Sequence, residues 1–293
     1  MAAIWVEAVT KNYRHTKALN SVTFEIQKGS VAALVGENGA GKSTLLHILA
    51  GLTRPDSGVV EVNGSAPTQD WKWLSCIGFV DQDASLQGGM TLTRCSKMGK
   101  DLNLIWNEDL LLAGCEQLKI PLDRAIKQLS GGQRHSVAVL LALAKEPEVM
   151  LLDEPLASLD PISRRTLLGI LLSHAYDKSM TILLSSHLVS DLERSCDHLV
   201  LLSRGSVVLS KPTDEILETH YWTTSSDKNL ELIRQMCDAE TDYVIELDSQ
   251  ILLSTANHEI VDLLGAKPAG LEEIIIARMS GSPVFARQAQ SER

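Results

Sequence analysis

The chain has 293 residues, 44% hydrophobic and 22% charged, which is an ordinary composition for a globular protein able to bury a core. Its formal net charge of −10 argues against binding to a nucleic-acid backbone, which usually requires a basic surface. No apolar stretch approaches the roughly 18–20 residues needed to cross a bilayer, so a membrane role is expected to require a partner protein.

The first 80 residues show the patterns of short strands joined by turns. Apolar and polar residues alternate in several segments, and Val31–Val35 is a continuous apolar run typical of a buried strand. The predicted strands here are 4–9, 22–26, 31–35, 59–62 and 77–80, with a helix over 44–50.

Between about residues 84 and 145 the strand signals disappear and helical spacing takes over, notably over 108–118 and 134–144. Further strands are predicted at 149–152 and 181–185, with a helix over 161–175 between them and a hairpin over 198–209. Mixed strands and helices around a parallel core, interrupted by a helical insert, indicate an α/β fold.

The pattern changes again after Pro212. Helices are predicted over 213–219, 229–238 and 271–279, and strands over 243–247 and 250–254. We therefore divide the chain into a main domain at 1–219 with its insert at about 84–145, a small α/β appendage at 220–280, and a polar tail at 281–293 expected to be disordered. The appendage is interpreted either as a regulatory or dimer-supporting module or as a cap on the main domain.

Residues 36–43 satisfy the pattern GxxxxGK[ST] between a predicted strand and a predicted helix, the context this motif requires. Glycines let the backbone wrap around phosphates, and the helix N-terminus adds positive potential. We predict that a nucleotide binds here: Lys42 would neutralise the β and γ phosphates, Ser43 would ligate Mg²⁺, and Thr44 would hold the α and β groups. The alternative is a simple glycine-rich turn. The predicted phosphate-binding residues are Gly36, Glu37, Asn38, Gly39, Ala40, Gly41, Lys42, Ser43 and Thr44.

Two adjacent acids, Asp153 and Glu154, close the apolar strand Val149–Leu152. Next to the phosphate loop, Asp153 would bind Mg²⁺ directly or through water. Successive strand residues face opposite ways, so Glu154 would point elsewhere, towards an attacking water, as a general base or water-positioning group. The alternative is a solvated strand end.

The sequence LSGGQ, residues 129–133, is the signature of one family, and this chain resembles the ATP-binding subunits of ABC (ATP-binding cassette) transporters over about residues 4–220. Further positions match in order: Tyr13, Gln82, the segment 158–160 and His187. The resemblance implies a P-loop NTPase cassette with an N-terminal antiparallel β subdomain, a mixed core sheet and a helical insert. It also implies that Tyr13 stacks on adenine, that Gln82 senses Mg²⁺ and links to the insert, and that His187 contacts the γ-phosphate. With Glu154, Gln82 and His187 form the expected catalytic set.

The same resemblance implies a head-to-tail homodimer or heterodimer of these subunits. In it, Ser130, Gly131, Gly132 and Gln133 complete the ATP site of the opposite subunit. Glycines at a helix start are themselves an amide-rich anion site, so one γ-phosphate would bridge two subunits and hydrolysis would release them. Arg134 and His135, which follow, are expected to be exposed helix residues.

Weaker similarities point to the ABC-2-type bacterial exporter ATPases, at residues 104–107, 120–123, 185–188, 191–193, 196–198 and 270–273. The resulting expectation is an ATPase subunit that powers export through a separate permease and docks on it through residues 84–99. The alternatives are an importer subunit, a lipid or polysaccharide exporter subunit, or a soluble regulatory ATPase acting on a protein partner. Substrate, direction of transport and permease are not encoded in these motifs.

The expected location is the cytoplasm, with attachment to the inner face of the cell membrane through the permease. Residues 1–13 lack a basic region followed by an apolar run, so they do not resemble a signal peptide. The five cysteines are scattered and form no CxxC pair, which indicates reduced thiols. ATP and Mg²⁺ are the expected ligands, and no nucleic-acid partner is expected.

Overall fold

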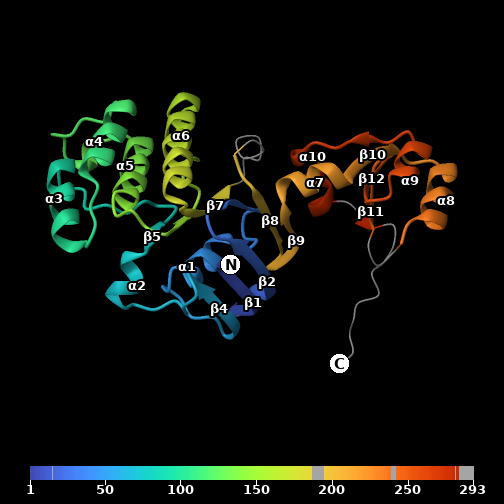
Figure 1. The fold of residues 1–293 in the computed structure, drawn as a ribbon, viewed down its shortest axis with the longest axis horizontal. Helices are drawn as coiled ribbons and strands as arrows, with labels where there is room; N and C mark the ends of the chain where they lie inside the picture. Colours follow the sequence, from blue (N-terminus) through green and yellow to red (C-terminus); the bar gives the residue numbers. More distant parts are fainter. Residues whose placement is uncertain (15, 187–194, 239–241, 281, 284–293) are drawn as a thin grey trace. The chain divides into compact units, whose positions relative to one another are not determined.

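The computed structural model describes residues 1–14, 16–186, 195–238, 242–280 and 282–283, and the chain divides into two compact units (Figure 1). The first unit is Met1–Ser210 and the second is Lys211–Arg293. The predicted main domain ended later, at residue 219. The helix α7 (Thr213–Thr219) instead belongs to the second unit, where the Ile216 carbonyl oxygen accepts a hydrogen bond from His220 Nδ1 at 2.8 Å.

The chain begins in a three-stranded antiparallel sheet with the strand order β2-β1-β4. Ile4 and Val6 of β1 are fully buried, as their spacing on one face predicts. The strand extends beyond the predicted 4–9 and has Tyr13 as its last residue. The bounds are β1 (Ala2–Tyr13), β2 (Thr16–Gln27) and β4 (Ser57–Val62).

The central sheet of the first unit has the order β5-β6-β7-β3-β8-β9, and the pairs from β5 to β8 are parallel. Every residue of β3, β6 and β7 is buried, which explains why β3 and β6 are entirely apolar. The loops after these three neighbouring strands therefore meet at one edge of the sheet. The bounds are β3 (Val31–Val35), β5 (Ile77–Val80), β6 (Val149–Leu152), β7 (Thr181–Ser186), β8 (His198–Ser203) and β9 (Ser206–Pro212).

Helices α3, α4 and α5 lie together as the insert between β5 and β6, beside α6 (Figure 1). The helix α6 begins with Pro161 and is capped by Asp160, whose side chain accepts the backbone N–H groups of Ile162 and Ser163. The short helix α2 was not predicted, because five residues are too few to show a helical period. The bounds are α1 (Lys42–Leu49), α2 (Trp71–Ser75), α3 (Leu92–Leu102), α4 (Glu108–Gln117), the 3₁₀ turn Ile126–Gln128, α5 (Gly131–Leu143) and α6 (Pro161–Lys178).

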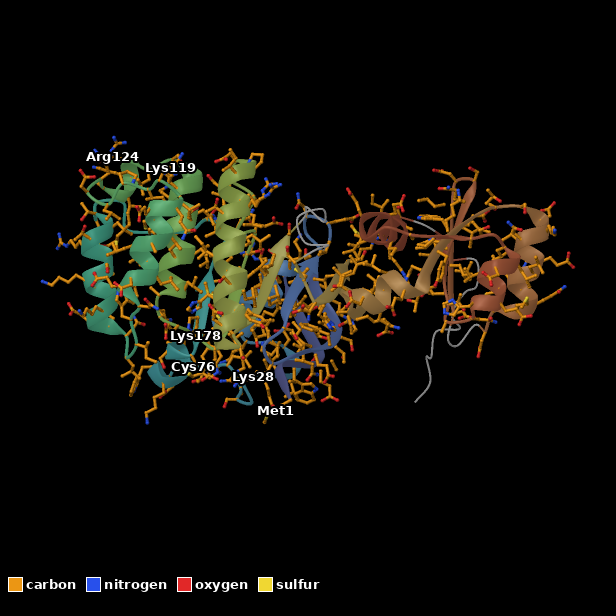
Figure 2. The ribbon with its side chains drawn as sticks, turned by 45° about the horizontal axis from the view of Figure 1, so that its top comes forward. Met1, Lys28, Cys76, Lys119, Arg124 and Lys178 are labelled. Atoms are coloured by element: carbon orange, nitrogen blue, oxygen red, sulfur yellow. The ribbon has the colours of Figure 1, made fainter. Side chains whose placement is uncertain are left out.

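Side chains around Glu148, just before β6, tie the central sheet to the N-terminal one. Glu148 accepts hydrogen bonds from Lys28 Nζ at 3.3 Å and from Asn63 Nδ2 at 2.9 Å. Figure 2 shows Lys28 and Met1 on one side of the first unit, and Lys119 and Arg124 of the helical insert on the other side. These bonds hold the beginning of β6, the strand that leads to the two acids.

The second unit contains a five-stranded sheet with the order β13-β10-β12-β11-β14, whose paired strands are antiparallel. The strands β11 and β12 have the predicted bounds, whereas β10 and α9 were not predicted. The bounds are β10 (His220–Thr224), β11 (Tyr243–Leu247), β12 (Gln250–Ser254), β13 (Lys267–Pro268), β14 (Ser282–Pro283), α7, α8 (Asp227–Met236), α9 (His258–Leu263) and α10 (Leu271–Ser280).

Two residues of the tail that was predicted to be disordered, Ser282 and Pro283, form the short strand β14. Ser282–Pro283 pairs with Glu246 and Ile245, so these two residues supply hydrogen-bonding groups to the edge of β11. The rest of the predicted tail lies outside the described residues. Within the residues that the structure does describe, none of the helices is both long enough and apolar enough to cross a membrane.

Candidate functional site

The glycine-rich loop after β3 is shaped by close backbone contacts. A Cβ atom on Gly36 would lie 2.2 Å from the carbonyl oxygen of Leu202, and one on Gly41 would lie 2.5 Å from the carbonyl oxygen of Ala18. Gly39 and Gly41 also have φ angles of 81° and 108°, which residues with a side chain rarely adopt. Because Gly41 provides no capping side chain, the first amides of α1 remain available to a phosphate.

Lys42, at the start of α1, points back into this loop. Its Nζ atom donates hydrogen bonds to the carbonyl oxygens of Gly36 at 2.8 Å and of Glu37 at 3.2 Å, and only 7% of its surface is exposed. The loop therefore curls around a positive charge, which is the arrangement that a polyphosphate requires. Ser43 and Thr44 follow in the same helical turn and are half-buried.

The two acids after β6 lie in the same region. Asp153 is almost completely buried, and its Oδ1 atom accepts a 2.6 Å hydrogen bond from the Ser185 hydroxyl. Its Oδ2 atom is buried without a hydrogen-bond partner among the residues that the structure describes. A buried carboxylate oxygen left unpaired is costly, and oxygen is the ligand that Mg²⁺ prefers. The residues present therefore fit a magnesium ion.

Glu154 faces Lys42. Its Oε1 atom is 3.9 Å from Lys42 Nζ, and both side chains are more than nine-tenths buried. Glu154 also has a φ angle of 49°, in the left-handed region that a residue with a side chain adopts at a cost. The structure thus brings the predicted phosphate loop and the predicted acids together, although more than a hundred residues separate them in the sequence.

Tyr13, the predicted adenine contact, is the last residue of β1. The residue is 46% exposed, and Lys11 Nζ lies 5.5 Å from its ring centroid. Lys11 is itself held by Arg54 O at 2.9 Å and Asp56 Oδ1 at 3.0 Å. Hydrogen bonds from Lys11 and then from Asn12 lower the pKa of Asp56, so the negative charge that anchors Lys11 is favoured.

Gln82 is exposed in the loop after β5. Its backbone N–H donates to Asp81 Oδ1 at 2.9 Å, and the same oxygen lies 3.3 Å from His47 Nε2 of α1. Asp81 thus joins this loop to the helix that follows the phosphate loop. His187, the predicted γ-phosphate contact, lies outside the described residues.

The signature residues begin α5. The Ser130 hydroxyl accepts the N–H of Gln133, and Gln133 Oε1 accepts the N–H of Ser130, both at 3.1 Å. A Cβ atom on Gly132 would lie 2.7 Å from the Ser158 carbonyl, so this glycine permits close packing of α5 on the segment after Glu154. Gly131 is exposed, and the helix start presents its backbone amides.

The prediction that Arg134 and His135 are exposed is wrong. Arg134 is half-buried and donates to Leu129 O at 2.8 Å, and His135 is only 3% exposed. Burial lowers the pKa of His135, while the negative charge of Asp153 acts in the opposite direction. The reason is packing: residues 135–140 of α5 are all buried, so this part of the helix has no solvent face.

Sequence reasoning did not assign a role to Ser185 or Lys11. Ser185 connects the two acids, and Lys11 supports the Tyr13 ring. The available signal for Ser185 was a polar residue at the end of an apolar strand. No pattern identified Lys11, because its partners lie more than forty residues away.

A glycine loop around a buried lysine, together with an acid pair at the end of another strand of the same parallel sheet, defines the P-loop nucleotide-binding class. The ABC transporter family profile matches residues 19–157. A probable sulfate/thiosulfate import ATP-binding protein, CysA of Chlorella vulgaris, is 37% identical over 214 residues, which cover 70% of this chain and 89% of that protein.

Two further proteins extend the comparison. The energy-coupling factor transporter ATP-binding protein EcfA2 of Ligilactobacillus salivarius (strain UCC118) is 31% identical over 250 residues, covering 81% of this chain and 84% of that one. A bacterial ABC transporter cassette solved as a dimer has a TM-score of 0.64 at 26% identity, covering 72% of this chain and 98% of that one. The chain belongs to the ABC transporter family: it has the P-loop cassette fold and is an ATP-binding, ABC-type ATPase coupled to transport.

Proposed function

We propose that this chain is the ATP-hydrolysing subunit of an ABC-2-type exporter and acts on a separate permease at the inner face of the cell membrane. The observation that carries the hydrolysis assignment is the convergence of Lys42, Asp153 and Glu154 at one edge of the central sheet, with Asp153 Oδ2 left unpaired among the described residues.

ATP binding would rearrange the contacts of Lys42. The loop at 36–44 would surround the phosphates with amides, and Lys42 would exchange the carbonyls of Gly36 and Glu37 for phosphate oxygens. When Lys42 Nζ turns to the phosphates, Glu154, whose Oε1 atom now lies 3.9 Å from it, would become available to orient the attacking water. His187 would contact the γ-phosphate. Ser43, Gln82 and Asp153 would hold Mg²⁺, which supplies positive charge to the phosphates.

The adenine and the partner subunit would use other exposed elements. Tyr13 would stack on the base with the face of its ring that Lys11 leaves open. The amide-bearing start of α5, with Ser130, Gly131, Gly132 and Gln133, would close the ATP site of a second subunit. Cassettes of this family dimerise, and the exposed Gly131 is compatible with such a contact.

The permease would dock in a groove of about 660 Å³ between the loop after β5 and helix α3. The groove is lined mainly by apolar side chains, including Leu86, Met90, Met98, Leu102 and Trp106. Methionines adapt to irregular partners, and an apolar face of a permease helix would fit such a surface. Gln82 lies in the same loop, so a change at the phosphate would reach the groove directly.

Export rests on the resemblance of residues 104–107, 120–123 and 270–273 to ABC-2-type subunits. Import is the second candidate, supported by the name of the Chlorella relative, a probable sulfate/thiosulfate importer subunit. The identity of the membrane partner separates the two, because the two groups of transporters use different permeases.

The test is purification of the tagged chain from native membranes, with the co-purifying integral membrane protein identified. Met98→Asp in the groove is expected to abolish co-purification while ATP binding persists. Leu112→Asp is the matched control, because Leu112 is similarly exposed (41% against 44%) but does not line the groove. An ABC-2-type permease with about six apolar helices supports export. Co-purification of an importer permease would refute the export proposal. If no membrane protein co-purifies, the alternative of a regulatory ATPase is favoured.

A further inference from the structure

Ser185 makes hydrogen bonds with both residues of the acid pair, Asp153 and Glu154. It is fully buried in β7, where it pairs with Leu34 of β3. Leu152 of β6 pairs with Leu184 of β7, so the following residues, Asp153 and Ser185, continue side by side beyond this pair. This position places the serine at the sheet edge from which the phosphate loop also leaves.

The Ser185 hydroxyl makes two buried hydrogen bonds, one to each acid. It donates to Asp153 Oδ1 at 2.6 Å and accepts from the backbone N–H of Glu154 at 2.8 Å. A hydroxyl has one donor and two acceptor sites, so a single orientation of its proton satisfies both bonds. The bond to Asp153 has the length of a charge-assisted O–H···O⁻ contact.

For Asp153, this bond determines which oxygen remains for a cation. Oδ1 is engaged by the serine, whereas Oδ2 is buried and lacks a partner within the described part of the chain. The bond therefore restrains rotation of the carboxylate, and Oδ2 is the oxygen that remains available as a ligand for a metal ion. Partners that orient a ligating carboxylate in this way tune metal affinity without touching the metal.

For Glu154, the same hydroxyl anchors the backbone where it leaves the strand. The φ angle of 49° places this residue in a region that side chains disfavour, so its conformation must be held by neighbouring groups. The hydrogen bond from its N–H to Ser185 supplies such a restraint. It thereby fixes the point from which the Glu154 side chain reaches Lys42 and the phosphate site.

We propose that Ser185 is a positioning residue for ATP hydrolysis, whose single hydroxyl orients the metal-binding oxygen of Asp153 and the backbone of Glu154 together. The inference rests on the proposed roles of those two acids. Ser185 itself contacts neither of the reacting groups; it acts through the two residues that do.

The experiment compares Ser185→Ala and Ser185→Thr with the wild-type chain. Thr181→Val is the control, because Thr181 is also fully buried in β7 but its hydroxyl accepts the backbone N–H of Gly29, at 2.9 Å, and bonds neither acid. Three quantities are measured: kcat and KM for ATP, the affinity for a fluorescent ATP analogue with Mg²⁺ and with EDTA, and the melting temperature.

Ser185→Ala is expected to lower kcat by about 10- to 100-fold and to reduce the gain in nucleotide affinity that Mg²⁺ provides. Affinity in EDTA should not change, because the phosphate loop is intact. Ser185→Thr should restore much of both properties, since it retains the hydroxyl. Thr181→Val should match the wild type in kcat and in the Mg²⁺ effect.

Wild-type kcat and a wild-type Mg²⁺ effect in Ser185→Ala would overturn the inference. So would a loss of kcat that accompanies a lower melting temperature but leaves the Mg²⁺ effect intact. If the alanine variant does not fold, Ser185→Cys, with similar volume and a weaker donor, takes its place under the same criteria. Normal hydrolysis by Glu154→Gln would instead refute the proposed roles of the acids.

Discussion

Replacing Glu154 by glutamine is expected to destabilise the nucleotide-free chain and at the same time to increase its stabilisation by ATP. Lys42 and Glu154 lie 3.9 Å apart and are more than nine-tenths buried. Two charges about 4 Å apart attract by about 4 kcal/mol at an effective dielectric constant of about 20. Lys42 keeps its carbonyl acceptors on Gly36 and Glu37, and glutamine still offers an amide oxygen, so the net loss should be nearer to 2 kcal/mol.

For a unit of this size, a loss of about 2 kcal/mol lowers the melting temperature by roughly 4–8 °C. Bound ATP brings its own negative charge to Lys42, so the deficit should disappear in the complex. The ATP-induced rise in melting temperature should therefore be larger in the variant than in the wild type. Hydrolysis should fall by about 10²- to 10⁴-fold, because the water-orienting group is lost.

The assay is thermal unfolding of the purified chain with and without ATP, together with phosphate release. Glu148→Gln is the control, because Glu148 pairs with Lys28 at the shorter distance of 3.3 Å but both side chains are about half exposed. Exposed pairs contribute about 0–1 kcal/mol, so this variant should melt near the wild-type temperature. Equal melting temperatures for Glu154→Gln and wild type, with equal shifts by ATP, would refute the argument.

Two further predictions concern other parts of the chain. Ser130→Arg should preserve ATP binding by the single subunit but block dimer-dependent hydrolysis; unchanged turnover would count against a composite site. Burial, and then the charge of Arg278, lower the pKa of His220 to about 4. Between about pH 6.5 and pH 4, His220 is protonated in the unfolded chain but stays neutral in the folded chain. The free energy of unfolding should therefore fall by roughly 3 kcal/mol as the pH falls from 6.5 to 4. Urea unfolding should show this decline in the wild type and a flatter profile in His220→Gln.

Local patterns were sufficient for the parts of the site that each lie within one short segment. The phosphate loop, the acid pair and the LSGGQ helix start were predicted from residue types at fixed spacing, next to strands or helices with a clear period. The strands β11 and β12 were predicted with their observed bounds for the same reason. In contrast, β10 was not predicted, because its five residues become a strand through pairing with β12 and β13.

By itself the sequence determined the class of fold, the nucleotide-binding loop and the family, because these depend on short-range spacing that the chain carries along its length. Only the tertiary structure decided which side chains meet. The register of β6 against β7 placed Ser185 beside Asp153, the packing of α5 buried His135, and the meeting of two loops put Glu154 next to Lys42. Such contacts depend on strand register and on burial from all sides, and a periodic pattern reports only the conformation of its own segment.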